Sequence, residues 1–452
     1  MNVMSFVHEG LGNSSYLVDI GDGHALVVDP DRTVDRYLDA AKARGWAITH
    51  VFETHLHADF VSGALELRAA TGAELFVPES AEVRFPHRPV KPGEVLRAGQ
   101  GTVTSVASPG HTPEHTSYAL SMAGATPALF SGGSLLVGGA ARTDLIAPHM
   151  TDPLTRAQFR TIKSAFNDLP DETLLLPTHG GGSFCSARSG GERSSTLGLE
   201  RRTNPLLSHE SENEFAAWFP TTFPAAPRYF FRLRPINQAG PRLRSTIAEP
   251  PTLPPTDFER LRGDATVIDV RPQAEFMAGH IPGALSNTFR DSFATWLGWL
   301  VPEGAKLLFV LGPEPLPRVL DECLLVGFER FAGVLSGGMQ AWDRAGHEVS
   351  RADLAGADVA RMLIAEGAVP LDVRERNEFA DGHIPGALHI PLGDLEDRAA
   401  EIPDDLPIVT YCGHGERSAT ALSLLERLDF QELTNLDGGI DAWREGGLEI
   451  ER

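Results

Sequence analysis

The segment Gly-His-Ile-Pro-Gly-Ala-Leu occupies residues 279–285, and the same residues occur again at 382–388. Asp-Val-Arg stands before each copy, at 269–271 and at 372–374. A pattern that returns after about 100 residues indicates two modules of one design. In both modules short apolar runs alternate with amphipathic stretches, which predicts open α/β sheets. The repeated segment therefore decides the fold of the C-terminal half.

The repeats divide the rest of the chain. We expect a first domain at 1–247, a linker at 248–257 and two repeated domains at 258–352 and 353–452. Four of the ten linker residues are proline, which favours an extended connection. The total of 452 residues agrees with about 150 residues per domain.

The composition excludes several classes of protein. A net charge of −22 argues against a nucleic-acid partner. A hydrophobic content of 42% argues against disorder, and no apolar run reaches the roughly 18 residues of a membrane span. We expect no signal peptide, because no basic segment precedes an apolar one at the N-terminus. The three cysteines, Cys185, Cys323 and Cys412, predict a reducing cytoplasm without disulfides.

Histidines are concentrated in the first domain, in motifs that follow predicted strands. Thr-His-Leu-His-Ala-Asp-Phe occupies 54–60, Ser-Pro-Gly-His 108–111 and Leu-Pro-Thr-His 176–179, while Leu-Phe-Ser-Gly-Gly occupies 129–133. Neutral imidazoles that converge from such loops suit zinc or iron.

Together these motifs resemble the metallo-β-lactamase superfamily, in its glyoxalase II and persulfide dioxygenase branch. The resemblance implies an αββα sandwich with a metal at the strand ends. In the persulfide dioxygenases two histidines and one aspartate hold iron, and the matching histidines here are His55 and His111. Gly133 stands where the family has the aspartate, and Phe60 stands where it has a further histidine. The metal site is therefore expected to be degenerate.

The remaining candidate ligands are His55, His57 and His111, with Asp59 and His179 as further candidates. Three imidazoles and a water are a known arrangement for catalytic zinc. Fe(II), Zn(II) and the absence of any metal all stay open. Asp144 is another carboxylate that could replace the missing aspartate.

Two other residues of this domain have alternative interpretations. Arg142 lies where the dioxygenases carry an arginine that contacts the carboxylate of the thiol carrier, and a guanidinium suits that role. An ordinary surface arginine is the competing interpretation. Cys185 lies in a glycine-rich turn, where we expect a packed thiol without a chemical role.

The last repeat contains a cysteine in a reactive setting. A predicted strand at 407–411 leads into Cys412-Gly413-His414-Gly415-Glu416-Arg417-Ser418, and a predicted helix follows at 419–428. Backbone N–H groups of such a loop can turn inward, and the helix N-terminus adds partial positive charge. Both effects favour a thiolate. Arg417 can reach back toward the same anion.

This repeat resembles the rhodanese family of sulfurtransferases, in which the loop cysteine carries sulfane sulfur as a persulfide. The resemblance assigns that role to Cys412, and a loop of six residues favours sulfur over phosphate. In the middle repeat Leu311 occupies the equivalent position, so that domain is expected to be inactive. Cys323 is expected to belong to its core.

The domain order resembles persulfide dioxygenase–rhodanese fusions of hydrogen sulfide detoxification. We therefore expect a cytoplasmic sulfurtransferase that acts through Cys412, beside a dioxygenase-like domain of uncertain activity. The implied partners are a low-molecular-weight thiol persulfide such as glutathione persulfide, thiosulfate or sulfite, with neither nucleic acid nor membrane. A homodimer is one option. The alternatives are a non-catalytic sulfur carrier or scaffold, and a mononuclear zinc thioester hydrolase.

Overall fold

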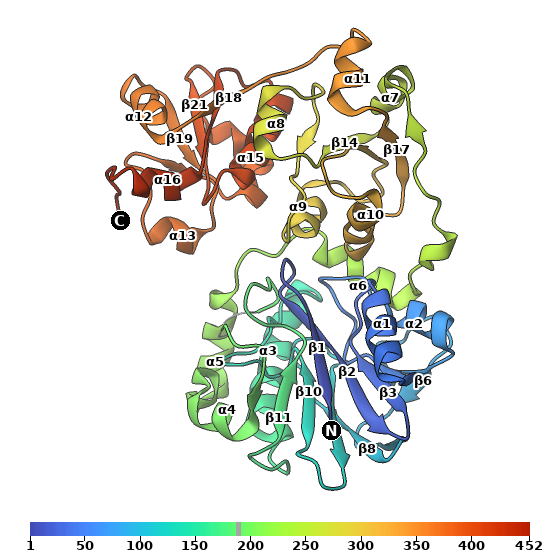
Figure 1. The fold of residues 1–452 in the computed structure, drawn as a ribbon. Coiled ribbons are helices and arrows are strands. Elements are labelled where there is room, and N and C mark those ends of the chain that lie inside the picture. The colour runs from blue at the N-terminus through green and yellow to red at the C-terminus, as the bar shows by residue number, and fades with distance from the viewer. Residues whose placement is uncertain (187–190) are drawn as a thin grey trace. The chain divides into compact units, whose positions relative to one another are not determined.

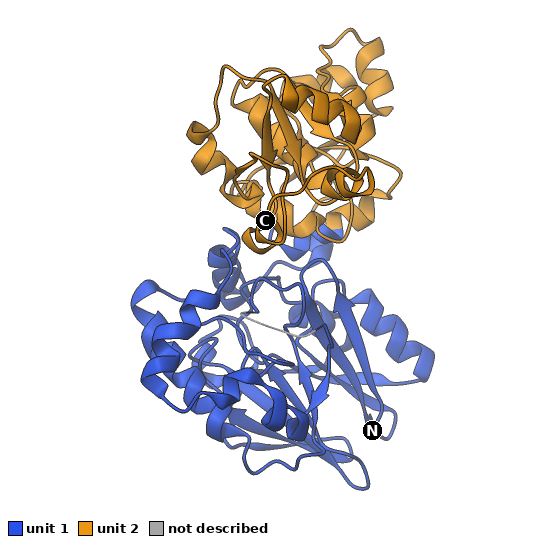
Figure 2. Cartoon of the chain, turned by 90° about the vertical axis from the view of Figure 1, so that its left-hand side faces the viewer, with its two compact units in different colours: residues 1–247, 321–327 blue, residues 248–320, 328–452 orange. Residues whose placement is uncertain are grey.

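The computed structural model describes residues 1–186 and 191–452. Two compact units make up the chain (Figure 2): Met1–Ile247 with Asp321–Gly327, and Ala248–Leu320 with Phe328–Arg452. Within the described residues, no helix has both the length and the apolar character that crossing a membrane demands.

Two six-stranded sheets form the N-terminal unit (Figure 1). The first sheet has the order β1 (Val3–His8), β2 (Asn13–Gly21), β3 (His24–Val28), β4 (Ala47–Phe52), β5 (Glu74–Pro78), β6 (Arg88–Val90). The second has the order β12 (Ser195–Thr196), β11 (Leu174–Pro177), β10 (Ala128–Gly132), β9 (Thr116–Met122), β8 (Gly101–Ala107), β7 (Val95–Ala98). The helices of this unit are α1 (Asp35–Arg44), α2 (Ala64–Thr71), α3 (Thr151–Arg160), α4 (Leu197–Thr203), α5 (Glu212–Trp218) and α6 (Phe230–Ala239).

Strand alternation explains the layers of this unit. On β2, Tyr16 and Val18 belong to a core that also contains Phe130 of the second sheet, so this core lies between the sheets. Leu17 points the other way, into a second core that includes Tyr37 of α1. A third core joins the outer face of the second sheet to Phe159 of α3. The predicted αββα sandwich is confirmed.

Two five-stranded parallel sheets form the C-terminal unit, and their strand orders are equivalent. The first order is β13 (Thr252–Leu253), β17 (Phe331–Leu335), β16 (Leu307–Val310), β14 (Thr266–Asp269), β15 (Leu285–Ser286). The second is β18 (Asp353–Ala355), β22 (Leu433–Leu436), β21 (Ile408–Tyr411), β19 (Val369–Asp372), β20 (Leu388–His389). The two predicted open α/β domains are therefore confirmed.

Helices connect these parallel strands, as crossover connections require. The first repeat has α7 (Pro255–Arg262), α8 (Gln273–Ala278), α9 (Phe293–Leu300), α10 (Leu316–Leu325) and α11 (Gly338–Arg344). The second has α12 (Ala357–Ala365), α13 (Arg376–Ala380), α14 (Leu395–Arg398), α15 (Glu416–Arg427) and α16 (Gly439–Glu445).

The proline-rich segment 248–257 differs from the extended linker that we predicted. Thr252–Leu253 forms β13 and pairs in parallel with Val334–Leu335 of β17. Pro255 begins α7. Prolines are tolerated at both places, because an edge strand leaves N–H groups unpaired and the first turn of a helix needs no N–H donors.

The structure explains why Asp-Val-Arg and the glycine segment recur together. In the second repeat the Arg374 guanidinium donates to the Asp372 carboxylate at 2.5–3.0 Å and to the carbonyl oxygen of Gly382 at 3.0 Å. Both charged side chains are buried. The ion pair thus fixes the end of β19 to the start of the glycine segment.

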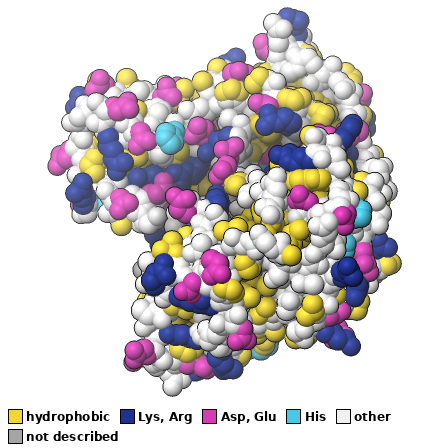
Figure 3. Space-filling view, turned by 60° about the horizontal axis from the view of Figure 1, so that its bottom comes forward, with side chains coloured by type: hydrophobic (Ala, Val, Ile, Leu, Met, Phe, Trp, Pro, Cys, Tyr) yellow, Lys and Arg dark blue, Asp and Glu magenta, His cyan; other side chains and the backbone are white. Residues whose placement is uncertain are grey.

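Charges of both signs are dispersed over one face of the molecule. Figure 3 shows acidic and basic side chains interspersed on the face that it displays, with hydrophobic groups between them. The net charge of −22 therefore does not form a single acidic patch on this face.

We expect Asp372→Asn to lower the local free energy of unfolding by about 3–5 kcal/mol, because the variant leaves the charge of Arg374 buried without its counter-ion. Amide hydrogen exchange in β19 and β21 measures this loss. Glu401→Gln, which breaks the exposed pair with Arg398, serves as the control and should lower the free energy of unfolding far less, because solvent screens that pair. Equal effects of the two variants would contradict the structural role of the buried pair.

Candidate functional site

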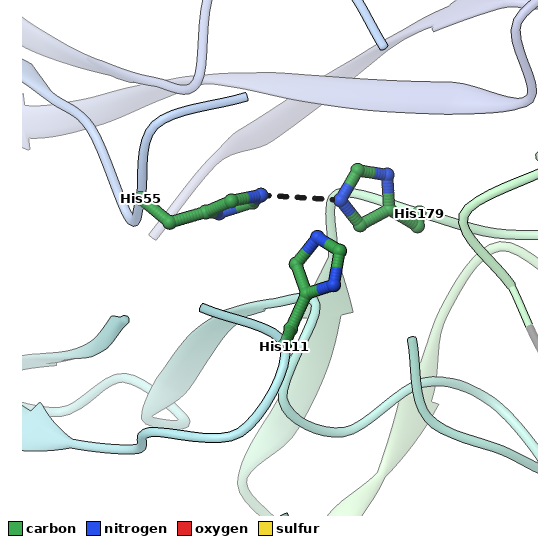
Figure 4. A group of neighbouring side chains, drawn as sticks. All are labelled: His55, His111 and His179. Atoms are coloured by element: carbon green, nitrogen blue, oxygen red, sulfur yellow. Dashed lines mark hydrogen bonds between the residues drawn. The ribbon is translucent and has the colours of Figure 1, made fainter. Parts of the chain in front are cut away.

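Three histidines from separate loops meet in the N-terminal unit. His55 follows β4, His111 lies between β8 and β9, and His179 follows β11. All three are buried, and one nitrogen of each ring lies within 4.8 Å of a nitrogen of the other two. The Nε2 atoms of His55 and His179 are 3.3 Å apart (Figure 4). The rings therefore point at one another as three ligands of an ion would.

Hydrogen bonds at Nδ1 orient two of these rings. The Thr54 hydroxyl donates to Asp29 at 2.7 Å, so its oxygen accepts from Nδ1 of His55 at 2.8 Å. Nδ1 of His111 donates to the carbonyl oxygen of Arg142 at 2.6 Å. With the proton at Nδ1, each ring has its lone pair at Nε2. Nε2 of His111 is buried and lacks a hydrogen-bond partner among the described residues.

Two polar groups hold the third ring. The amide oxygen of Asn13 and the carboxylate of Asp59 each lie 3.1 Å from Nδ1 of His179. Burial favours the neutral acid, yet the nearby His179 and His57 lower the pKa of Asp59 below its ordinary value. A carboxylate behind a histidine is the usual support of a metal-binding imidazole. Asp59, predicted as a candidate ligand, thus lies behind His179.

The chemistry of the three rings fits a metal ion. Burial and the neighbouring His57 lower the pKa of His55, and burial and His179 lower that of His111 to about 3. Both rings are therefore neutral, which is the form that binds metals. Two nitrogens at 2.0–2.1 Å from a tetrahedral ion lie about 3.3 Å apart, which is the separation between His55 and His179.

His57, also predicted as a ligand, has acidic neighbours. Its Nε2 lies 2.9 Å from Glu53 and 3.3 Å from Asp29. Burial opposes the charged ring, but the two carboxylates raise the pKa of His57 to about 10. His57 also belongs to two other groups of possible metal ligands, one with Asp29 and His55 and one with Asp59 and His179. The ligand set of His55, His57 and His111 stays a prediction. The set of His55, His111 and His179 is the alternative.

The two departures from the family pattern are accommodated by packing. A Cβ at Gly133 would lie 2.5 Å from Cδ2 of His111, and the Gly133 N–H donates to Nε2 of His115 at 2.9 Å. Phe60 stacks on His57, with ring centroids 4.2 Å apart. An aspartate at position 133 would therefore displace His111 in this packing.

Arg142, predicted to bind a thiol carrier, is buried and has partners within the protein. It donates to both carboxylate oxygens of Asp144 at 2.7 and 2.8 Å and to the Phe184 carbonyl oxygen at 3.2 Å. This arrangement also engages Asp144, the other candidate carboxylate. The carrier-binding role of Arg142 stays a prediction, while its backbone carbonyl orients His111.

Several residues that shape this site have no recognisable sequence motif. Glu114 accepts from the Leu56 N–H at 3.1 Å and pairs with both guanidinium nitrogens of Arg234 at 2.7 and 2.9 Å. Asn237, also on α6, donates to the carbonyl oxygens of His57 and Phe60. Since α6 lies far along the chain, only the folded structure shows that it holds the loop at 54–60.

Cys185 is buried in this unit. Its backbone carbonyl accepts from the Arg142 N–H at 2.8 Å. Burial and the Asp59 carboxylate raise the pKa of its thiol, which favours the unreactive form.

The C-terminal candidate site is the loop between β21 and α15. The Gly415 N–H donates to Sγ of Cys412 at 3.1 Å, and the Ser418 hydroxyl lies 3.6 Å from the same sulfur. Cys412 is 1% exposed. α15 begins at Glu416, earlier than the predicted 419, so its N-terminus lies within the loop. Amide, hydroxyl and helix end together favour an anionic sulfur.

Arg417 has a specific partner within the second repeat. Its guanidinium forms two hydrogen bonds of 2.7 Å with the Glu378 carboxylate on α13. Burial opposes the charge on Arg417, but Glu378 and Cys412 raise its pKa. The predicted anion-binding arginine thus lies near the sulfur, with two of its donors committed to Glu378.

The remaining loop residues have varied surroundings. His414 is 74% exposed in its side chain and lies 3.1 Å from Asp441, while Gly413 and Glu416 are partly buried. In the first repeat Leu311 is partly buried and provides no thiol. Cys323 is fully buried on α10, and burial raises the pKa of its thiol.

Comparisons with protein families divide the chain in the same way. Residues 8–179 match the metallo-beta-lactamase superfamily, and residues 254–345 and 356–446 each match the rhodanese-like domain. A sulfurtransferase of Allochromatium vinosum is 39% identical over 90 residues, which are 20% of this chain and 84% of that protein.

Relatives of the N-terminal half are also found. A hydroxyacylglutathione hydrolase of Polaromonas is 34% identical over 171 residues, 37% of this chain, and the chain spans 62% of that protein's length. Among solved structures, a metallo-beta-lactamase from Staphylococcus aureus has 28% identity and a TM-score of 0.66, covering 74% of this chain and 98% of that one.

We expect His179→Ala to weaken zinc and iron binding by at least about tenfold, because it removes one of three converging nitrogens. Metal analysis after metal-replete expression measures the loss, and the exposed His149 provides the control His149→Ala. Full metal content in His179→Ala, with loss in His57→Ala, would instead favour His57 as the third ligand.

The pairing of Glu378 with Arg417 predicts a pH dependence of the Cys412 loop. Burial raises the pKa of Glu378, but Arg417 outweighs it and lowers the pKa below the ordinary value. The stabilisation of the folded loop by the Glu378–Arg417 pair is therefore complete above the ordinary glutamate pKa. It is lost as pH falls through the lowered pKa of Glu378. Hydrogen exchange of α15 should show this loss in the wild type and not in Glu378→Gln. Identical pH profiles of the wild type and Glu378→Gln would contradict a stabilising role of this pair.

Proposed function

Because this chain belongs to the rhodanese family in its C-terminal half and joins it to a metallo-beta-lactamase superfamily domain, we propose that it is a sulfurtransferase of persulfide metabolism acting through Cys412. The observation that carries the proposal is the contact of Sγ with the Gly415 amide at the start of α15. Such a setting suits a sulfur that alternates between thiolate and persulfide anion.

The proposed cycle has two transfers. The Cys412 thiolate attacks the outer sulfur of thiosulfate, the S–S bond of the donor breaks, and sulfite leaves with the bonding electron pair. A thiolate, sulfite or cyanide then attacks the outer sulfur of the Cys412 persulfide, and Cys412 leaves as a thiolate. The charge stays on sulfur in every state, so the loop amides can stabilise each anion without rearranging.

The N-terminal domain supports a second reaction on the same class of compounds. His55, His111 and His179 would hold a metal ion, which would supply oxygen activation as iron or a Lewis acid as zinc. The residues of the chain orient the rings: Thr54 and the Arg142 carbonyl hold Nδ1 of His55 and His111, and Asp59 stands behind His179. We propose that this domain acts on a low-molecular-weight persulfide such as glutathione persulfide.

Hydrolysis of a thioester is a second candidate for the N-terminal domain. The likeness to hydroxyacylglutathione hydrolases and a set of three converging imidazoles favour it. Metal analysis combined with oxygen uptake on glutathione persulfide and thiol release from a glutathione thioester separates the two. Dioxygenation requires iron and consumes oxygen, while a zinc hydrolase releases thiol from the thioester without oxygen uptake.

We expect Cys412→Ser to lower thiosulfate-dependent sulfur transfer by at least about a thousandfold, since the serine hydroxyl is not ionised at neutral pH and cannot carry sulfane sulfur. Cyanide-dependent turnover measures the loss. Cys323→Ser and Cys185→Ser, whose thiols both lie in the N-terminal unit, control for the removal of a thiol. Retained turnover in Cys412→Ser, or none in the wild type, would refute the proposed function and favour a sulfur carrier or scaffold.

A further inference from the structure

The first repeat lies directly against the helix that begins at the Cys412 loop. Two residues of α15 receive its contacts: the Ser286 N–H donates to the hydroxyl of Ser423 at 3.1 Å, and Nε2 of His280 lies 2.9 Å from Glu426. These contacts are largely buried. The first repeat, which has Leu311 in place of the loop cysteine, is therefore part of the surroundings of the reactive loop.

A second set of contacts reaches the loop itself. Asn435 of β22 donates to Oε1 of Gln273 at 3.4 Å and to the Gly415 carbonyl oxygen at 3.1 Å. A Cβ at Gly415 would lie 2.5 Å from Oε1 of Gln273, so the two touch. Gln273 stands at the start of α8 in the first repeat, which places that repeat beside the residue whose amide binds Sγ of Cys412.

In the sequence, Arg290 lies between two residues that contact the second repeat. It follows Ser286, which binds Ser423, and precedes Trp299, whose ring would lie 2.3 Å from a Cβ at Gly393. Its backbone carbonyl accepts from the Phe293 N–H at 2.8 Å, which fixes the turn into α9. The segment that carries Arg290 is therefore held against the second repeat at both ends.

Arg290 interacts electrostatically with residues of the reactive loop. Burial lowers its pKa, while the charges of Glu416 and Cys412 act in the opposite direction, so these groups are its electrostatic neighbours. Among the described residues, no hydrogen bond or ion pair engages its guanidinium. By contrast, Arg417 binds Glu378 through two nitrogens, and Arg374 binds Asp372.

We propose that Arg290 of the first repeat binds the anionic end of the sulfur donor at Cys412, and so selects for donors such as thiosulfate whose leaving group is an oxyanion. This inference rests on the proposed sulfurtransferase function. A guanidinium with uncommitted donors suits sulfonate oxygens, which it can bind through two N–H groups. It also supplies local positive charge in a chain of net charge −22.

The role of Arg290 predicts a change in donor recognition that a merely structural residue would not produce. Arg290→Ala should raise KM for thiosulfate by about tenfold or more and change kcat by less than about threefold, because donor binding is lost while the thiolate remains. KM for an uncharged dialkyl trisulfide should stay unchanged. Arg290→Lys should restore part of the affinity for thiosulfate and of its salt dependence.

The matched control is Arg330→Ala, since Arg330 is an exposed arginine of the same repeat that binds the Gly304 carbonyl oxygen. Its KM values should equal those of the wild type. Equal KM values for thiosulfate in Arg290→Ala and wild type would overturn the inference, as would equal losses with both donors.

A binding experiment separates this inference from the proposed function. Calorimetric titration of thiosulfate into Cys412→Ser protein, with and without Arg290→Ala, measures donor binding without turnover. Arg290-dependent binding supports the subsite even if the wild type has no transferase activity, which would refute the proposed function alone. Turnover in the wild type with binding that is indifferent to Arg290 would refute the subsite alone.

Discussion

The hydrogen bond from the Gly415 amide to the Cys412 sulfur is the contact on which the geometry of the loop between β21 and α15 depends. It requires a left-handed backbone at Gly415, whose φ is +113°, and a helix that starts at the next residue. It also requires close packing behind the loop, where a Cβ at Gly439 would lie 2.4 Å from the Cys412 carbonyl oxygen. The glycines of this repeat thus serve the approach of backbone to sulfur.

The same requirement explains how the two repeats diverged. In the first repeat a Cβ at Gly338, the counterpart of Gly439, would meet nothing within 4 Å, since no cysteine loop packs there. The buried pairing of Asp269 with Arg271 is kept in that repeat, because the end of its central strand still has to be held. The buried ion pair is therefore common to both repeats, while position 311 of the first repeat holds a leucine and provides no thiol.

In the N-terminal unit the corresponding constraint is the orientation of buried imidazoles. A histidine motif predicts ligands but not which ring nitrogen is free, because that depends on the partner of the other nitrogen. His55 and His111 could be named from their motifs, and His179 was only one of the further candidates. In the folded structure Asn13 and Asp59 lie at Nδ1 of His179, and Nε2 of His55 lies 3.3 Å from its Nε2. Glu114 and Asn237 could not be named at all.

The two repeats could be predicted from the sequence, because a repeated segment is a local pattern, and the N-terminal sandwich from motifs that resemble a known family. The loop motif also predicts Cys412 as the reactive cysteine. Tertiary structure alone decided which charges are available. Arg417 could be placed near the sulfur from its spacing, but its commitment to Glu378 depends on a helix about 40 residues away. Arg290 lies in the other repeat, and only the packing of two domains brings such a residue to the loop.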